Sequence, residues 1–135
     1  MGRAWGMAGA SSPSTARRGA FWHTVEAPLA VAATIADAAS PECPLLVDCL
    51  TLWLSNIMLA EAPVEEEFAA LNAALRDAAG PIVLVANEVG LGLVPQTPLG
   101  RRFRDLAGSL NQEVAALADR VVFVAAGLPL VLKGG

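Results

Sequence analysis

The stretch PIVLVANEVGLGLVPQTPLGRRFRDLAGSLNQ, residues 81–112, decides the fold because it predicts a strand, a loop and a helix in succession. Residues 82–85 form a continuous aliphatic run, which is typical of a strand covered on both faces in a parallel sheet. Asn87 and Glu88 follow where this strand ends. The carboxyl ends of parallel strands line the ligand crevice of open α/β sheets, so this polar pair is placed where binding sites form.

The helix is predicted to start at Thr97 and Pro98, an N-cap residue followed by a proline suited to the first helical position. Apolar residues then recur at steps of three and four, which predicts one apolar stripe against the sheet. The stripe consists of Leu99, Phe103, Leu106, Leu110, Val114 and Leu117. Arg101, Arg102 and Arg104 lie on the opposite face. They are either phosphate ligands or a solvated helix face, and the second is the commoner explanation of such a charge run.

The rest of the chain alternates further strands and helices. Strands are predicted at residues 44–50, 120–126 and 130–132, and helices at 28–39, 51–60 and 63–78. This order favours an α/β fold with a mostly parallel sheet flanked by helices. We expect strands 44–50, 82–85 and 120–126 to lie side by side.

Composition limits the possible functions. A chain of 135 residues with net charge -4 and no basic block is one modest domain and an unlikely partner of nucleic acid. It has no apolar run long enough for a membrane span. Cys43 and Cys49 are too few for a disulfide framework, which predicts reduced thiols in a cytoplasmic protein. We expect residues 1–16 to be a disordered leader and residues 17–135 a single α/β domain.

Asp48 closes the strand predicted at residues 44–50 and has two interpretations. A carboxylate there resembles a Walker B position, which holds Mg²⁺ through water beside phosphates. It could instead cap the helix predicted from Thr51. In the same way, Glu88 could be a solvated loop acid and Asn87 a turn former.

Three segments, NEVGLGLVP, RRFRDLAGSLNQ and AAGLPLVLK, closely resemble the C-terminal half of one family. It is the bifunctional adenosylcobinamide kinase and adenosylcobinamide-phosphate guanylyltransferase family of cobalamin biosynthesis. The similarity extends back through VDCLTLWLSN, residues 47–56, and WHTVEAP, residues 22–28, and covers about residues 17–133. Matched polar and glycine positions over such a length are far more specific than a lone motif.

The resemblance implies a P-loop-NTPase-like, RecA-like fold and a transferase. Its reactions are phosphorylation of adenosylcobinamide by a nucleoside triphosphate and transfer of GMP from GTP to that phosphate. GTP, ATP and Mg²⁺ are therefore the implied cofactors. The resemblance also implies that Asp48 contacts the nucleotide or its Mg²⁺ through water and that Glu26 is a second nucleotide-binding carboxylate. Asn87 and Glu88 are candidates for lining the same site.

The family's histidine nucleophile, which carries GMP, has no counterpart at the matching position, where this chain has Ser14. His23, the only histidine, follows Trp22, where the family tends to have arginine. We interpret His23 as an ordinary, partly exposed imidazole and predict no catalytic residue in the chain.

Members of this family also begin with a strand and a Gly-Lys-Ser phosphate loop. The single lysine here is Lys133, near the end of the chain. We therefore interpret the chain as an N-terminally truncated member that lacks its first strand and phosphate loop and is inactive alone. The alternative is a non-catalytic remnant, a nucleotide-binding or oligomerisation module of the same fold. An uncovered sheet edge predicts a homo-oligomer.

Overall fold

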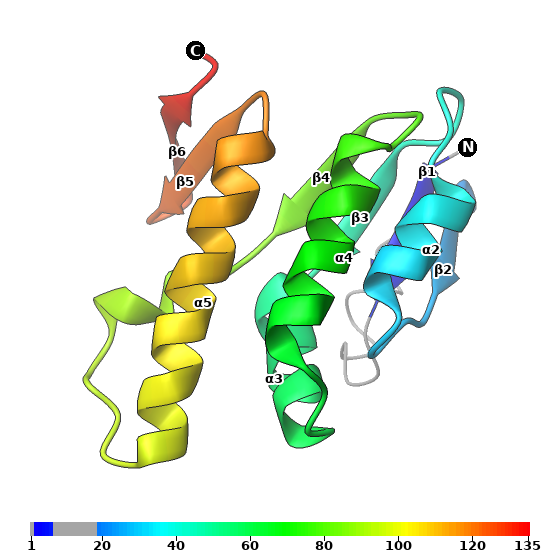
Figure 1. The fold of residues 1–135 in the computed structure, drawn as a ribbon. Helices are drawn as coiled ribbons and strands as arrows, with labels where there is room; N and C mark the ends of the chain where they lie inside the picture. Colours follow the sequence, from blue (N-terminus) through cyan, green and yellow to red (C-terminus); the bar gives the residue numbers. More distant parts are fainter. Residues whose placement is uncertain (1, 7–18) are drawn as a thin grey trace.

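The computed structural model describes residues 2–6 and 19–135. Four strands form one parallel sheet: β1 (Gly2–Gly6), β2 (Trp22–Val25), β3 (Leu45–Asp48) and β4 (Ile82–Val85). The helices are α2 (Val31–Ala38), α3 (Leu50–Leu59), α4 (Val64–Arg76), the 3₁₀ turn η1 (Val89–Leu91) and α5 (Pro98–Leu117). The chain ends with strands β5 (Val121–Ala125) and β6 (Leu128–Lys133). The predicted α/β fold with a parallel sheet is confirmed (Figure 1).

The parallel sheet has the strand order β2-β1-β3-β4, which corrects one prediction. We expected a missing first strand and a disordered leader, yet Gly2–Gly6 pairs with both β2 and β3. Sequence patterns missed β1 because pairing between strands satisfies backbone N–H and C=O groups, whatever the side chains. Residues 1 and 7–16 of the predicted leader lie outside the described residues.

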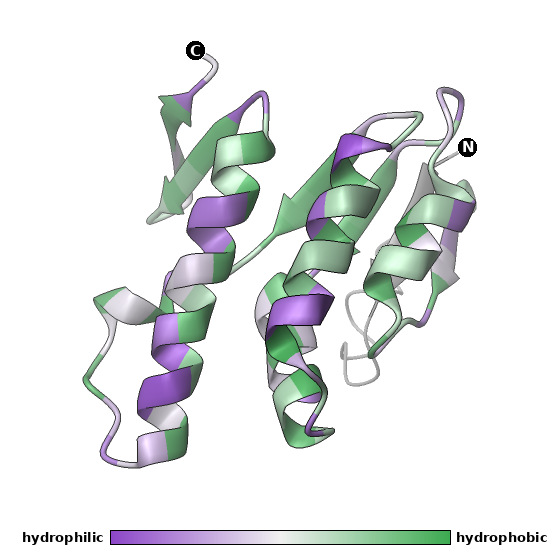
Figure 2. Cartoon of the chain, in the orientation of Figure 1, coloured by the Kyte–Doolittle hydropathy of each residue, from purple (hydrophilic) through white to green (hydrophobic). Residues whose placement is uncertain are grey.

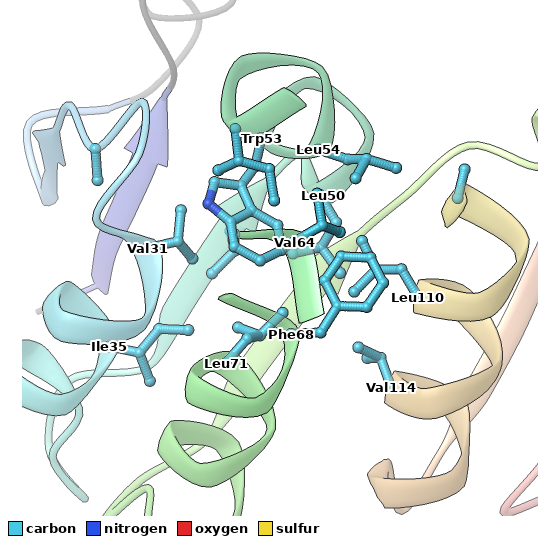
Figure 3. Close-up of a cluster of buried hydrophobic side chains, with 14 of the residues drawn as sticks. Val31, Ile35, Leu50, Trp53, Leu54, Val64, Phe68, Leu71, Leu110 and Val114 are labelled. Carbon is cyan, nitrogen blue, oxygen red and sulfur yellow. The ribbon is translucent and has the colours of Figure 1, made fainter. Parts of the chain in front are cut away.

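Helices α2, α4 and α5 run side by side along one face of the strands (Figure 1). Their buried side chains meet those of α3 in one apolar core around Trp53, whose side chain is fully buried (Figure 3). The Trp53 ring packs against Phe68 of α4 with the ring centres 6.2 Å apart. Leu110 and Val114 bring α5 into the same core. The core therefore joins α2, α4 and α5 on one face of the sheet to α3.

The second face of β4 is open, which corrects the expectation of a strand covered on both faces. Ile82 and Leu84 pack against the core, whereas Val83 is 59% exposed and Val85 39% exposed. A continuous aliphatic run cannot reveal this, because it looks the same whether one face or both are covered.

Strand β5 does not join the parallel sheet as we expected. Among the described residues it pairs only with β6, antiparallel, through a two-residue turn at Ala126 and Gly127. Both turn residues have positive φ, +52° and +75°, which matches the twist of a tight hairpin. A hairpin needs only local chain closure, so β6 is the nearest partner available to β5. Figure 2 shows how apolar this hairpin is.

Helix α5 starts as predicted. Thr97 is its N-cap, and the Thr97 side chain accepts a hydrogen bond from the Gly100 N–H at 3.0 Å. Pro98 occupies the first turn. The apolar stripe is shorter than predicted, because Leu99 is 58% exposed whereas Leu110 and Val114 are buried. The first turn of α5 thus extends past the core and depends on its cap.

We predict that Thr97→Ala lowers the free energy of unfolding by about 1 kcal/mol, because the first turn of α5 then loses an acceptor for its N–H groups. Thr97→Ser keeps the hydroxyl and should stay close to the parent chain. Urea unfolding followed by far-UV circular dichroism measures both variants. Equal stabilities for the two would contradict this role of the cap.

Candidate functional site

The carboxyl edge of the parallel sheet gathers the polar residues that the sequence singled out. Asp48 ends β3 and is in register with Gly6 of β1 and Val85 of β4. Glu26 directly follows β2, and Asn87 and Glu88 follow β4 by two and three residues. All four residues therefore come from strand ends that point the same way. Since β1 separates β2 from β3, Glu26 and Asp48 are two strand spacings apart, about 10 Å.

Asp48 is half-buried, whereas Glu26 and Glu88 are exposed. The N-cap of α3 is Cys49, whose own side chain makes no capping hydrogen bond. Asp48 lies one residue before this N-cap. Its carboxylate sits at the last position of a strand whose neighbours Leu45 and Val47 are buried.

The segment after Glu26 is fastened to α3. The buried indole of Trp53 donates its Nε1–H to the Leu29 carbonyl at 2.9 Å, and the Asn56 side chain donates to the Pro28 carbonyl at 3.1 Å. A buried tryptophan usually needs an acceptor for its N–H, and this is the signal by which the sequence could have indicated the contact. Helix α3 thus holds the segment that follows β2, although α2 and β3 lie between them in the chain.

The Asn87–Glu88 segment is held from two sides. The backbone N–H of Asn87 donates to the Thr51 hydroxyl on α3 at 2.8 Å. On the other side, the Asn111 side chain on α5 donates to the Asn87 carbonyl at 3.2 Å and to Glu88 Oε1 at 3.0 Å. These bonds show that Asn111 holds the backbone of the loop after β4.

Two of the three arginines on α5 bind the same loop instead of projecting freely. Arg101 donates to the carbonyls of Pro95 and Gln96 at 3.3 and 2.9 Å, and Arg104 donates to the Gly90 carbonyl at 3.3 Å. Arg102 is exposed. Arg101 and Arg104 therefore stabilise the loop between β4 and α5.

His23 lies on β2, three positions before Glu26, and its side chain is exposed. Ser14, at the position of the family's nucleophile, lies outside the described residues. Both cysteines are free thiols, Cys49 buried and Cys43 half-buried.

The described residues contain no group of three or more side chains able to hold a metal ion by themselves. Mg²⁺ that accompanies a nucleotide needs only one or two protein carboxylates, because waters and the substrate phosphates complete its coordination. Asp48 and Glu26 supply hard oxygen ligands of the type that Mg²⁺ prefers. The donor set therefore fits a metal that arrives with a nucleotide.

Two hollows on the described part of the chain lie away from the carboxyl edge. A hollow of about 320 Å³ lies between α4 and α5, and one of about 270 Å³ lies between the end of α3 and the start of α5. Neither is lined by Glu26, Asp48, Asn87 or Glu88. In the described part of the chain, no helix is long and apolar enough to cross a membrane.

A parallel sheet with carboxylates and an amide at its carboxyl edge is the arrangement in which open α/β proteins bind ligands at their strand ends. The family described as cobinamide kinase / cobinamide phosphate guanyltransferase matches residues 13–132, and the chain belongs to this family.

Three curated relatives are similar over most of the chain. The bifunctional adenosylcobalamin biosynthesis protein CobP of Pseudomonas aeruginosa is 50% identical over 88% of this chain and 70% of its own length. The bifunctional adenosylcobalamin biosynthesis protein CobU of Salmonella typhimurium is 34% identical over 86% of this chain and 72% of its own length. The protein of the same name from Escherichia coli is 32% identical over 83% and 70%. The family named from the sequence is thereby confirmed.

Proposed function

We propose that this chain carries the nucleotide-binding edge of a transferase of cobalamin biosynthesis. The enzyme phosphorylates adenosylcobinamide with a nucleoside triphosphate and then transfers GMP from GTP to the new phosphate. The family and the relatives' names support the reaction class. The observation that carries the site is the register of the sheet, which brings Asp48, Glu26 and the Asn87–Glu88 segment to one edge.

In this proposal Asp48 would hold Mg²⁺ through water, and the metal would neutralise the phosphate charge of GTP or ATP. Its half-buried position on a rigid strand end suits that role, because the carboxylate is held without reorganisation. Glu26 contacts the nucleotide from the other side of β1. Both steps transfer a phosphorus group, for which positioning and charge neutralisation supply most of the acceleration.

We further propose that the sheet belongs to a P-loop-NTPase-like, RecA-like fold. We also propose that the protein acts in the cytoplasm. A phosphate loop needs a lysine that reaches the phosphates. The sole lysine of the printed sequence, Lys133, instead donates to the carbonyls of Ala115 and Ala116 at 3.0 and 2.9 Å, at the end of α5. These 135 residues are therefore expected to bind nucleotide without turning it over.

The first test is binding of Mg·GTP by isothermal titration calorimetry. Asp48→Asn should raise the dissociation constant about tenfold, because a charge-assisted contact to the hydrated metal is lost. Asp77→Asn is the matched control, since it makes the same chemical change at the C-cap of α4, away from the carboxyl edge. An Asp48→Asn chain that binds like the Asp77→Asn chain would remove Asp48 from the site.

The second test is incubation of the 135-residue chain with Mg²⁺ and GTP labelled at the α-phosphorus. We expect no acid-labile GMP on the protein, because neither a phosphate-loop lysine nor a histidine at the family position is present. A stoichiometric adduct would overturn this expectation. Repeating the incubation with His23→Ala would then show whether the imidazole carries the GMP.

A second candidate function is an oligomerisation module, favoured by the exposed hairpin. Both faces of the β5–β6 hairpin expose apolar side chains, with Val124 at 62% exposure on one face and Leu128 at 71% on the other; Leu132 is 63% exposed. Exposed apolar surface of this kind marks association sites.

We therefore predict a homo-oligomer, because association would bury this surface. Light scattering of the pure chain measures its mass, and a stable monomer at micromolar concentration would argue against the module. Val124→Lys with Leu128→Lys should shift the mass toward that of a monomer.

A further inference from the structure

The side-chain amide nitrogen of Asn111 donates both of its hydrogens to the loop after β4. One goes to the Asn87 carbonyl at 3.2 Å and the other to Glu88 Oε1 at 3.0 Å. Asn111 is half-buried on α5, one residue beyond the fully buried Leu110. The donor is therefore fixed by the core, while its acceptors lie at the carboxyl edge.

The other bonds to this loop act on its backbone. Thr51 accepts from the Asn87 N–H, and Arg104 donates to the Gly90 carbonyl. Within residues 2–6 and 19–135, Asn111 is the only hydrogen-bond partner of the Glu88 carboxylate. It is thus the contact that can set the direction of this carboxylate as well as the path of the chain.

We propose that Asn111 is a positioning residue that orients Glu88 toward a ligand at the carboxyl edge. The inference rests on the proposed function, in which that ligand is a magnesium nucleotide. The amide carries no charge, so it binds Oε1 without placing a cation beside the carboxylate. Oε2 then remains available to accept from a ligand N–H or from a metal-bound water.

The chain contains a matched control pair. Asn72 on α4 donates its Nδ2–H to Glu113 Oε2 on α5 at 2.7 Å, which is the same amide-to-carboxylate bond on the same helix α5. This pair lies between α4 and α5 and includes none of the carboxyl-edge residues. Asn72→Ala removes one amide-to-carboxylate bond, whereas Asn111→Ala removes a bond of the same type together with the bond to the Asn87 carbonyl. Only Asn111 acts on Glu88.

The experiment measures Mg·GTP dissociation constants for the parent chain, Asn111→Ala, Asn72→Ala, Glu88→Ala and the double variant Asn111→Ala with Glu88→Ala. Asn111→Ala should weaken binding about fivefold, the equivalent of one net hydrogen bond. Asn72→Ala should stay within about twofold, because its bond is remote from the edge. The double variant should bind like Glu88→Ala alone.

Equal weakening by Asn111→Ala in both backgrounds would overturn the proposal, since Asn111 would then act through the Asn87 backbone alone. Equal effects of Asn72→Ala and Asn111→Ala would also overturn it, because the loss would then reflect general stability.

A second measurement does not depend on nucleotide. Carbon-13 relaxation of the Glu88 side chain should show larger motion in Asn111→Ala, while Asn72→Ala should loosen only Glu113. A parent chain that fails to bind Mg·GTP would contradict the proposed function. The relaxation data would still decide whether Asn111 orients Glu88. Unchanged Glu88 motion in Asn111→Ala would overturn that role.

Discussion

Parallel pairing of β3 with its two neighbours is the constraint on which the site depends. The pairs Gly6 with Asp48 and Asp48 with Val85 fix the level at which the strands end. A shift of one residue would turn Val47 from the core to the open face and Asp48 from the edge into the sheet. Burial of Leu45 and Val47 therefore sets the position of the carboxylate, although neither residue touches a ligand.

The core supplies the second half of the site by holding two helices against the strand ends. Trp53 fills the centre of the core and its N–H fastens the segment that follows β2. Asn111 makes the corresponding connection from α5 to the segment that follows β4. In both cases a residue beside the apolar core donates hydrogen bonds to a polar loop. A loss of packing around that residue would therefore displace the carboxyl edge before the protein unfolds. This coupling is the physical reason why the helices matter to a site formed by strand ends.

Much of the fold could be predicted from the sequence, because its signals are local. Strand β4, the Thr97 cap and the acid at the end of β3 each follow from a run or a spacing within a few residues. Strand β1 could not be predicted, because a segment reading GRAWG has no strand pattern and is ordered by its neighbours. Pairing of β5 with β6 also escaped prediction, since apolar strands do not specify their partners. Strand ends in the sequence pointed to Asp48 and the segment after β4, and the family resemblance added Glu26. The contacts of Trp53, Thr51 and Arg104 that organise the edge are visible only in three dimensions.

The attachment of the terminal hairpin has a practical consequence. The ammonium group at the end of β6 lies on two carbonyls in the last turn of α5, where the helix dipole favours a cation. Because it belongs to the single lysine of the chain, a reagent that acylates lysine would remove this charge and weaken its contact with the helix. A dye or cross-linker coupled through that amine would therefore report on a protein in which the label itself had altered the contact between β6 and α5.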